Sequence, residues 1–238
     1  KTTMAENCAK ALGLDFYSTG AVVQKYELTG FVDATGTYQE SAFYKAYKNG
    51  GLFLFDELDA SSPAAIVAFN AALENGHWAC PSGEMVTRHK DFKVIASANT
   101  YGGGATLLYV GRNHLDGSTI DRFAFVILDY DWAFMAAVQG IAFDGKQAPY
   151  QYKCKGNSEN DIAAYFRDVT LYSAAAEELG IKHIISPRAT VNGIKLLRRD
   201  VKRDIVEHTF VWKGLDKGSI NKIKAHATAA LEALEGGE

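Results

Sequence analysis

Cysteine is scarce in this sequence, with three residues among 238. Cys8, Cys80 and Cys154 lie far apart, and no two of them form a C-x-x-C pair. The spacing that zinc knuckles and disulfide frameworks require is therefore absent. Isolated thiols are typical of a reducing compartment, so we expect a cytoplasmic protein.

Long runs of basic residues or of apolar residues are also missing. The formal net charge is only -3 at pH 7 and no extended basic run occurs, which gives no sign of binding to nucleic acid or to an anionic membrane. No apolar stretch is long enough to cross a bilayer. Internal repeats and low-complexity tracts are absent apart from the EGGE tail.

Apolar residues, in contrast, are abundant. The chain is 47% hydrophobic and 12% aromatic, which is enough to bury a sizeable core and predicts a folded globular protein. Helices and strands alternate in the first part. We predict an opening helix ended by Gly13, helices at residues 40–49 and 61–73, strands at residues 15–19, 52–55, 92–99 and 123–128, and a β-hairpin at residues 77–89. This order favours an α/β fold with a mainly parallel sheet.

The pattern becomes helical from about Tyr150. Apolar residues recur at helical spacing in segments near 158–179, 187–199, 200–212 and 217–235. We therefore expect two domains, an α/β core over residues 1–149 and a small all-helical domain over residues 150–238.

The strongest chemical signal is the stretch LFLFDELDA. Its apolar run at residues 52–55 has the character of a buried parallel strand, and it ends in Asp56 and Glu57. Both carboxylates would lie at the carboxyl edge of the sheet, where α/β folds bind ligands. In a P-loop NTPase the first acid helps to hold Mg²⁺ and the second polarises the attacking water.

The first residues give a related signal. Lys1 and Thr2 lead straight into a helix, as the end of a G-x-x-x-x-G-K-[ST] P-loop does. Every glycine of that motif would lie before Lys1, so we expect the chain to begin inside the motif and to bind Mg-ATP weakly as it stands.

The third signal is another apolar run, VIASAN, which ends in Asn99. Its amide is suited to hold a lytic water or to contact a γ-phosphate. The alternative is that asparagine occurs there because it tolerates turn conformations.

In their order and spacing, the segments KTT, LFLFDELDA, VIASANT, LDGSTIDRF and SPRA resemble the AAA+ ATPases. Within that family the resemblance is to the MoxR-like, CbbQ-like and cobaltochelatase ATPase-subunit (CobS-like) branch, and it covers nearly the whole chain. It implies a P-loop NTPase with a parallel-sheet core and a C-terminal all-helical lid.

The resemblance assigns the nucleotide-contacting positions of the family to residues of this chain. They are Lys1, Thr2 and Thr3 in Walker A, Asp56 and Glu57 in Walker B, Asn99 as sensor 1, Arg122 as the arginine finger and Arg188 as sensor 2 in the lid. By this resemblance ATP and Mg²⁺ are the cofactors, and Thr2 and Asp56 hold the metal. Glu57, Asn99 and the two arginines are the catalytic candidates.

The arginine assignments leave alternatives open. An arginine donated by a neighbouring subunit stabilises the charge that spreads over the γ-phosphate. Arg122 is placed first for this role because it directly precedes the predicted strand at residues 123–128, Arg112 is a rival, and a salt bridge is the structural alternative. Arg188 follows Pro187 and either moves with the lid or is an ordinary first-turn arginine.

Two segments with aromatic residues each allow two interpretations of their role. Phe31 or Tyr38 either lines a central pore, where an aromatic side chain grips a polypeptide, or packs in an ordinary loop. The hairpin with Trp78 and Arg88 either contacts the next subunit or covers the sheet.

The resemblance implies an ATP-hydrolysing, hexameric ring that remodels a client protein, which in relatives often bears a von Willebrand factor A domain. The alternative is a truncated or degenerate P-loop module that binds or assembles without turnover. The polar residues at the strand ends favour the ATP-hydrolysing ring. The missing P-loop glycines favour the module without turnover.

Overall fold

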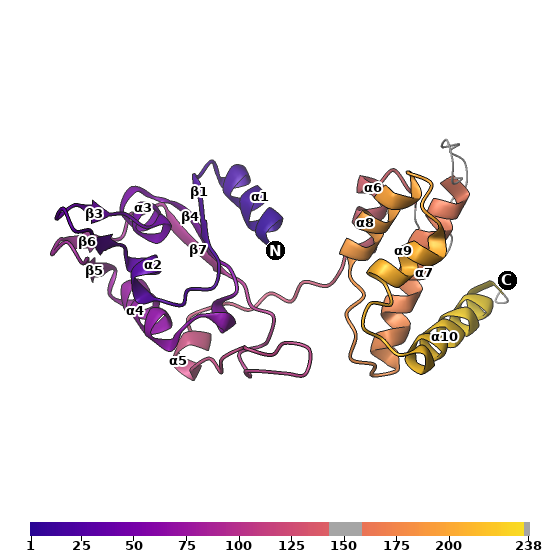
Figure 1. Cartoon of the computed structure of the whole chain (residues 1–238). Helices are drawn as coiled ribbons and strands as arrows, with labels where there is room; N and C mark the ends of the chain where they lie inside the picture. Colours follow the sequence, from indigo (N-terminus) through magenta and orange to yellow (C-terminus); the bar gives the residue numbers. More distant parts are fainter. Residues whose placement is uncertain (143–158, 236–238) are drawn as a thin grey trace. The chain divides into compact units, whose positions relative to one another are not determined.

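The computed structural model describes residues 1–142 and 159–235. Contacts divide the chain into two units, Lys1–Phe125 and Val126–Glu238 (Figure 1). The boundary predicted between residues 149 and 150 lies outside the described residues, as does Cys154. No helix in the described ranges is both long enough and apolar enough to span a membrane.

The first unit is built on a three-stranded parallel sheet in the order β1-β4-β7. The elements of this unit are α1 (Thr2–Leu12), β1 (Phe16–Thr19), α2 (Lys25–Thr29), β2 (Phe31–Val32), β3 (Tyr38–Gln39), α3 (Ala42–Asn49), β4 (Gly51–Phe55), a 3₁₀ turn (Leu58–Ala60), α4 (Pro63–Asn75), β5 (His77–Ala79), β6 (Met85–Thr87), β7 (Phe92–Ala96) and α5 (Gly117–Ile120). Phe55 is in register with Thr19 and with Ala96. The three strands therefore end together at one edge.

Strand β4 is buried at every position because it lies between two strands and is covered on both faces. Leu52 and Leu54 pack against α1, whereas Phe53 and Phe55 belong to the core formed with α3 and α4. Figure 1 shows α1 and α3 on opposite sides of the sheet. The predicted buried parallel strand is thus confirmed.

Helix α1 ends where predicted, at Gly13, which adopts a left-handed conformation with φ 65°. Met4, Cys8 and Leu12 recur at helical spacing along α1, but they do not form its buried face, since Met4 is 38% and Leu12 is 60% exposed. The buried residues are Ala5 and Ala9, whose small side chains let the helix lie close to β4.

Serine residues begin the two helices of the opposite face. The Ser41 hydroxyl accepts the backbone N–H of Tyr44 at 3.0 Å and starts α3. Ser62 caps α4 in the same way, and Pro63 occupies its first turn. The serine hydroxyls accept N–H groups that have no partner within the helix, and Pro63 has no N–H group that would need one. Both predicted helices are confirmed.

The strand predicted at residues 123–128 is wrong. Phe125, Val126, Ile127 and Leu128 are 52% to 76% exposed, and no sheet in the described part of the chain includes them. An apolar run becomes a strand only where another strand pairs with its backbone groups, and neither β1 nor β7 does so here.

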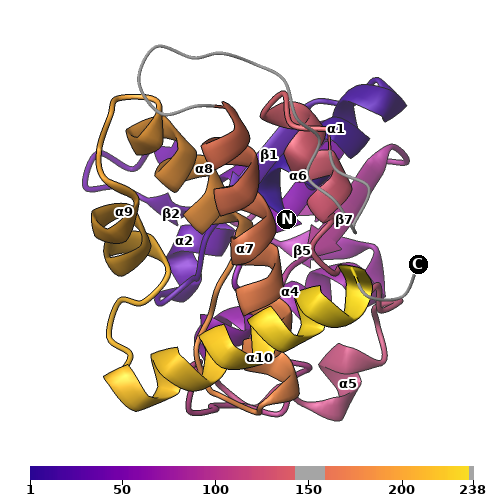
Figure 2. The ribbon, with the colours of Figure 1, turned by 90° about the vertical axis from the view of Figure 1, so that its right-hand side faces the viewer.

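Every element of secondary structure among the described residues of the second unit is a helix. Its helices are α6 (Trp132–Val138), α7 (Glu159–Glu178), α8 (Pro187–Leu197), α9 (Arg203–Phe210) and α10 (Lys217–Glu235). Figure 2 shows α10 crossing α7, and these two helices are in contact. The four helices predicted after residue 150 are confirmed, and α6 is an addition.

Charged side chains join the helices of this unit. Glu207 on α9 accepts hydrogen bonds from Arg203 at 2.8 Å, Lys224 at 3.0 Å and the Trp212 indole at 3.2 Å. Arg203 also pairs with Asp168 of α7. Glu207 is only 7% exposed. Its charge is not isolated, because several donors bind its carboxylate oxygens.

Candidate functional site

Polar side chains meet where β4 and β7 end. Asp56 continues the ladder of β4, since its backbone N–H donates to the Thr19 carbonyl at 2.8 Å. Its carboxylate accepts the Thr2 hydroxyl at 3.1 Å, the Glu57 backbone N–H at 3.0 Å and the Ser97 hydroxyl. The start of α1 and the tips of two strands are therefore joined at one carboxylate.

This environment keeps Asp56 ionised. Partial burial by itself would raise the pKa of Asp56, but the hydrogen bonds from Ser97, Thr2 and the Glu57 N–H, together with the charge of Lys1, lower the pKa below its usual value. The site thus presents a negative oxygen ligand.

Lys1 reaches the end of the neighbouring strand. Its ammonium donates to Oδ1 of Asn99 at 2.7 Å and to the Ala98 carbonyl. The structure therefore brings Lys1, Thr2, Asp56 and Asn99 together, as the sequence predicts. Thr3, the third predicted Walker A residue, is exposed on α1.

Glu57 has an uncommon backbone conformation. It is left-handed, with φ 54° and ψ 43°, and forms the junction between β4 and the 3₁₀ turn. Such a conformation costs a non-glycine residue on the order of 1 kcal/mol and is frequent at functional sites. The Leu58 N–H donates to the Ser97 carbonyl at 2.9 Å, which fixes this junction to the segment after β7.

Asp59 is a central residue that the sequence interpretation missed. It is 0% exposed, and its Oδ2 accepts three hydrogen bonds: from the Asn99 N–H at 3.1 Å, the Thr100 N–H at 3.0 Å and the Thr100 hydroxyl at 2.9 Å. It therefore holds the backbone that carries Asn99. The available signal is the second aspartate of DELD, three positions after Asp56.

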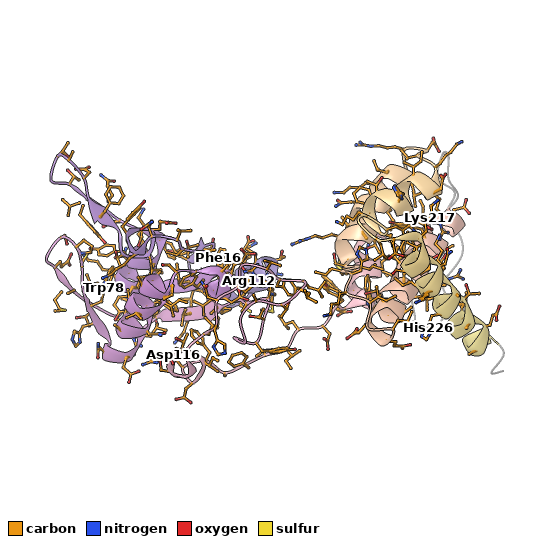
Figure 3. The ribbon with its side chains drawn as sticks, turned by 60° about the horizontal axis from the view of Figure 1, so that its bottom comes forward. Phe16, Trp78, Arg112, Asp116, Lys217 and His226 are labelled. Atoms are coloured by element: carbon orange, nitrogen blue, oxygen red, sulfur yellow. The ribbon has the colours of Figure 1, made fainter. Side chains whose placement is uncertain are left out.

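Arg112 links the carboxylates of Asp59 and Glu57. Its Nη1 donates to Asp59 Oδ1 at 3.0 Å, and its Nη2 donates to Glu57 Oε1 at 3.2 Å. The arginine side chain is only 12% exposed, whereas that of Glu57 is 47% exposed. Burial would lower the pKa of Arg112, but the contacts with Glu57 and Asp59 raise it. In Figure 3, Arg112 lies well apart from Trp78 of the β5–β6 hairpin.

The other two predicted arginines are not part of this cluster. Arg122, just after α5, pairs with Glu74 at 3.1 Å and donates to the Ser118 carbonyl. It lines a hollow of about 490 Å³ between α4 and the segment around α5. Arg188 is exposed in the first turn of α8 and belongs to the second unit.

The two aromatic candidates for a pore differ in exposure. Phe31 is 46% exposed and packs edge-on against Tyr26, with the ring centroids 5.9 Å apart. Tyr38 donates its hydroxyl to the Thr29 carbonyl at 2.5 Å and packs against Tyr44. Phe31 is therefore the more accessible of the two.

The hairpin residues contact the core of their own unit. Trp78 packs against Phe43, Tyr44 and Tyr47 of α3. Arg88 donates to the Leu73 carbonyl at the end of α4. These contacts favour the interpretation in which the hairpin covers the core.

The donor set at Asp56 is compatible with Mg²⁺. Thr2 Oγ1 and Asp56 Oδ2 lie 3.1 Å apart, and adjacent oxygen ligands of an octahedral Mg²⁺ lie about 3 Å apart when each bond is about 2.1 Å. No group of three histidine, cysteine or acidic side chains suited to a metal was found among the described residues. Two protein oxygens fit an ion whose other ligands come from water and phosphate.

Comparisons with known proteins place this site in context. The model of one sequence family, the AAA domain of the dynein-related subfamily, matches residues 1–123, which is more than half of the chain. No significant match was found among curated proteins.

Similar solved structures include two of NtrX from Brucella abortus. One has 16% sequence identity and a TM-score of 0.41, and the match covers 87% of this chain and 43% of that one. The other, in complex with ADP, has 17% identity and a TM-score of 0.39, covering 91% and 45%. The chain thus spans less than half the length of either NtrX chain.

Proposed function

Because the chain belongs to the AAA domain family, dynein-related subfamily, we propose that it binds Mg-ATP at the edge formed by β4 and β7 and hydrolyses it. The predicted fold class, an α/β P-loop NTPase core followed by a helical C-terminal part, is confirmed. One observation carries the proposal. Lys1, Thr2, Asp56 and Asn99 are linked by hydrogen bonds at the carboxyl ends of two adjacent parallel strands, where such folds bind ligands.

Three groups bind the phosphates in this proposal. The Lys1 ammonium contacts phosphate oxygens, and the backbone N–H groups at the start of α1 favour negative charge there. Thr2 and Asp56 would hold Mg²⁺, and the bound ion would neutralise part of the phosphate charge. The glycine-rich turn of a P-loop precedes its lysine, so the nucleotide assays are designed on a protein in which a G-x-x-x-x-G turn precedes Lys1.

Glu57 and Asn99 act on the attacking water. The water oxygen forms a bond to the γ-phosphorus, the bond to the ADP oxygen breaks, and the Glu57 carboxylate takes the proton from the water. The Asn99 amide orients the water or contacts the γ-phosphate. The left-handed backbone of Glu57 and its contact with Arg112 support a fixed position for this carboxylate.

Assembly completes the proposal. We assign Arg122 to the site of a neighbouring subunit in a hexameric ring and Arg188 to the nucleotide of its own chain, as in the MoxR-like, CbbQ-like and CobS-like branch. The ring would remodel a cytoplasmic client protein with a von Willebrand factor A domain. The exposed Phe31 is the side chain that would contact this client.

The test is ATP turnover by Glu57→Gln, measured in a protein with a G-x-x-x-x-G turn before Lys1. The amide cannot accept a proton, so we expect turnover to fall by about three orders of magnitude or more while the Kd for Mg-ATP stays within about threefold. Glu84→Gln is the matched control. Glu84 is 46% exposed and also paired with a cation, Lys48, but lies on the β5–β6 hairpin.

The control variant should hydrolyse ATP at the normal rate. Comparable rates for the two variants would remove Glu57 from the role of base. If the protein without either substitution binds Mg-ATP tightly but does not hydrolyse it, the result would instead favour the module that binds without hydrolysis.

A further inference from the structure

We propose that Arg112 is a positioning residue that acts on Glu57 of its own chain, with the buried Asp59 as its anchor. The proposal rests on the proposed role of Glu57 as the base. It removes Arg112 from the candidates for the arginine donated to a neighbouring subunit.

Asp59, the anchor, is held through both its side chain and its backbone. Asp59 is 0% exposed, and one of its oxygens is fully occupied by the backbone and hydroxyl donors of Asn99 and Thr100. The backbone N–H of Asn113, the residue after Arg112, donates to the Asp59 carbonyl at 2.6 Å. The segment that carries the arginine is therefore bound to the residue that its side chain contacts.

The guanidinium geometry explains why this residue is an arginine. Nη1 binds Asp59 and Nη2 binds Glu57, so one planar fork spans two carboxylates from one turn of chain. A lysine ammonium is a point charge on a flexible stem and lacks this fixed fork. Arg112 is 12% exposed and paired with both acids, so it is not available to a second subunit in this arrangement.

The contact restricts a side chain that would otherwise be mobile. Glu57 is 47% exposed, and a free glutamate loses up to about 2 kcal/mol of rotamer entropy when it is fixed. Arg112 holds only Oε1, which leaves Oε2 to take the proton of the water. A fixed base matters because small displacements of a reacting group cost large factors in rate.

The chain of contacts also links Glu57 to Asn99. Asp59 binds the Asn99 backbone through Oδ2 and Arg112 through Oδ1, and Arg112 binds Glu57. The two groups that act on the water are therefore positioned by one buried carboxylate.

The first experiment uses Arg112→Lys in the full chain with the glycine-rich turn before Lys1. Lysine keeps a charge beside Asp59, so the variant is expected to fold, but it loses the fork to Glu57. We expect kcat to fall about tenfold, with the Kd and KM for Mg-ATP within about twofold. Arg88→Lys is the control, because Arg88 donates to the Leu73 carbonyl of α4 rather than to a carboxylate of the site, and the kcat of this variant should not change.

A mixing experiment separates action within the chain from action on a neighbour. If Arg112 acts on its own Glu57, mixtures of Arg112→Lys and Glu57→Gln subunits gain no activity beyond the sum of the separate proteins. Recovery of turnover in the mixture would overturn the proposal, because it requires Arg112 of one subunit to serve Glu57 of another. An unchanged or increased kcat in Arg112→Lys would also overturn it.

A second measurement does not depend on turnover. Thermal unfolding of Arg112→Lys, Glu57→Gln and the double variant forms a cycle that isolates the contact between the two side chains. We expect the double variant to melt about 2 °C or more above the value predicted by adding the single effects. Additive changes in melting temperature would show that the two side chains do not interact, which would overturn the proposal. If the changes are non-additive but the protein never hydrolyses ATP, the contact exists and the proposed function is rejected.

Discussion

The ammonium of Lys1 donates a hydrogen bond of 2.7 Å to Oδ1 of Asn99, so the start of α1 is tied to the segment after β7. Phosphate oxygens are strong acceptors for an ammonium. Bound ATP would therefore compete with Asn99 for Lys1 and release the amide to contact water or the γ-phosphate.

This relationship leads to a prediction for Asn99→Ala. We expect turnover to fall by about one to two orders of magnitude, because one group that orients charge in the transition state is lost, while the Kd for Mg-ATP changes by less than about threefold. Steady-state kinetics and calorimetry give the two numbers. Asn75→Ala, at the exposed end of α4, is the control, and an equal loss in both variants would reject a specific role of Asn99.

Arg122→Ala tests assembly. In the structure Arg122 pairs with Glu74 of its own chain, a half-exposed contact that costs little to exchange for another. We expect Arg122→Ala to lose turnover and to keep nucleotide affinity within a few fold. Mixing it with Glu57→Gln should restore part of the activity, because wild-type Arg122 then faces wild-type Glu57 at some interfaces. Mixtures that stay inactive would show that Arg122 does not act across subunits.

Asp59→Asn tests the anchor through stability. Asparagine places an amide where four donors now converge and leaves Arg112 without its buried partner. Removing one member of a buried ion pair costs about 3–5 kcal/mol, so we expect the free energy of unfolding to fall by about 3 kcal/mol in urea titrations. The exposed Asp15→Asn is the control. A loss below about 1 kcal/mol would mean that the site around Asp59 rearranges freely.

The second unit should lose stability in acid through Glu207. Burial would raise the pKa of Glu207, but Arg203, Lys224 and Trp212 lower it below its usual value. A lowered pKa stabilises the folded state above the unfolded pKa of about 4.3, and this stabilisation is lost as the pH falls through the lower folded value.

The melting temperature of this unit should thus be steady from about pH 7 to 5 and fall below about pH 4. Glu207→Gln should reduce this acid dependence and lower the free energy of unfolding near pH 7 by about 1–2 kcal/mol. Thermal unfolding followed by tryptophan fluorescence is suitable because Trp212 contacts Glu207. An unchanged acid dependence in the variant would assign it to other groups.

The sequence predicts most of the fold because the signals are local. The apolar run at residues 52–55 locates β4, and the helical patterns at residues 40–49 and 61–73 locate α3 and α4. Helix α2 is missed because it has only five residues, although Gln24 and Glu27 form a capping box. The strand at residues 123–128 is predicted wrongly because its apolar character is local but its pairing is not.

The site is predictable where its residues follow strands. Asp56 and Asn99 meet because parallel strands end at one edge, and the contact of Thr2 with Asp56 confirms that α1 begins there. The pairing of Arg112 with Glu57 and Asp59 depends on the path of the loop between β7 and α5, which no periodicity describes. Arg122 is placed ahead of Arg112 because it precedes a predicted strand, and the structure has no strand at residues 123–128.

In the proposed function, Thr2 and Asp56 would hold Mg²⁺ against a nucleotide at the end of β4. The most direct test of this claim is calorimetry of ATP with and without Mg²⁺, on the protein with a G-x-x-x-x-G turn before Lys1 and on its Asp56→Asn variant. We predict that Mg²⁺ tightens ATP binding by about tenfold or more in the first protein, because the carboxylate is ionised and supplies a negative oxygen ligand. The variant should bind ATP with nearly the same affinity whether or not Mg²⁺ is present, and a variant that keeps the full Mg²⁺ dependence would contradict the claim.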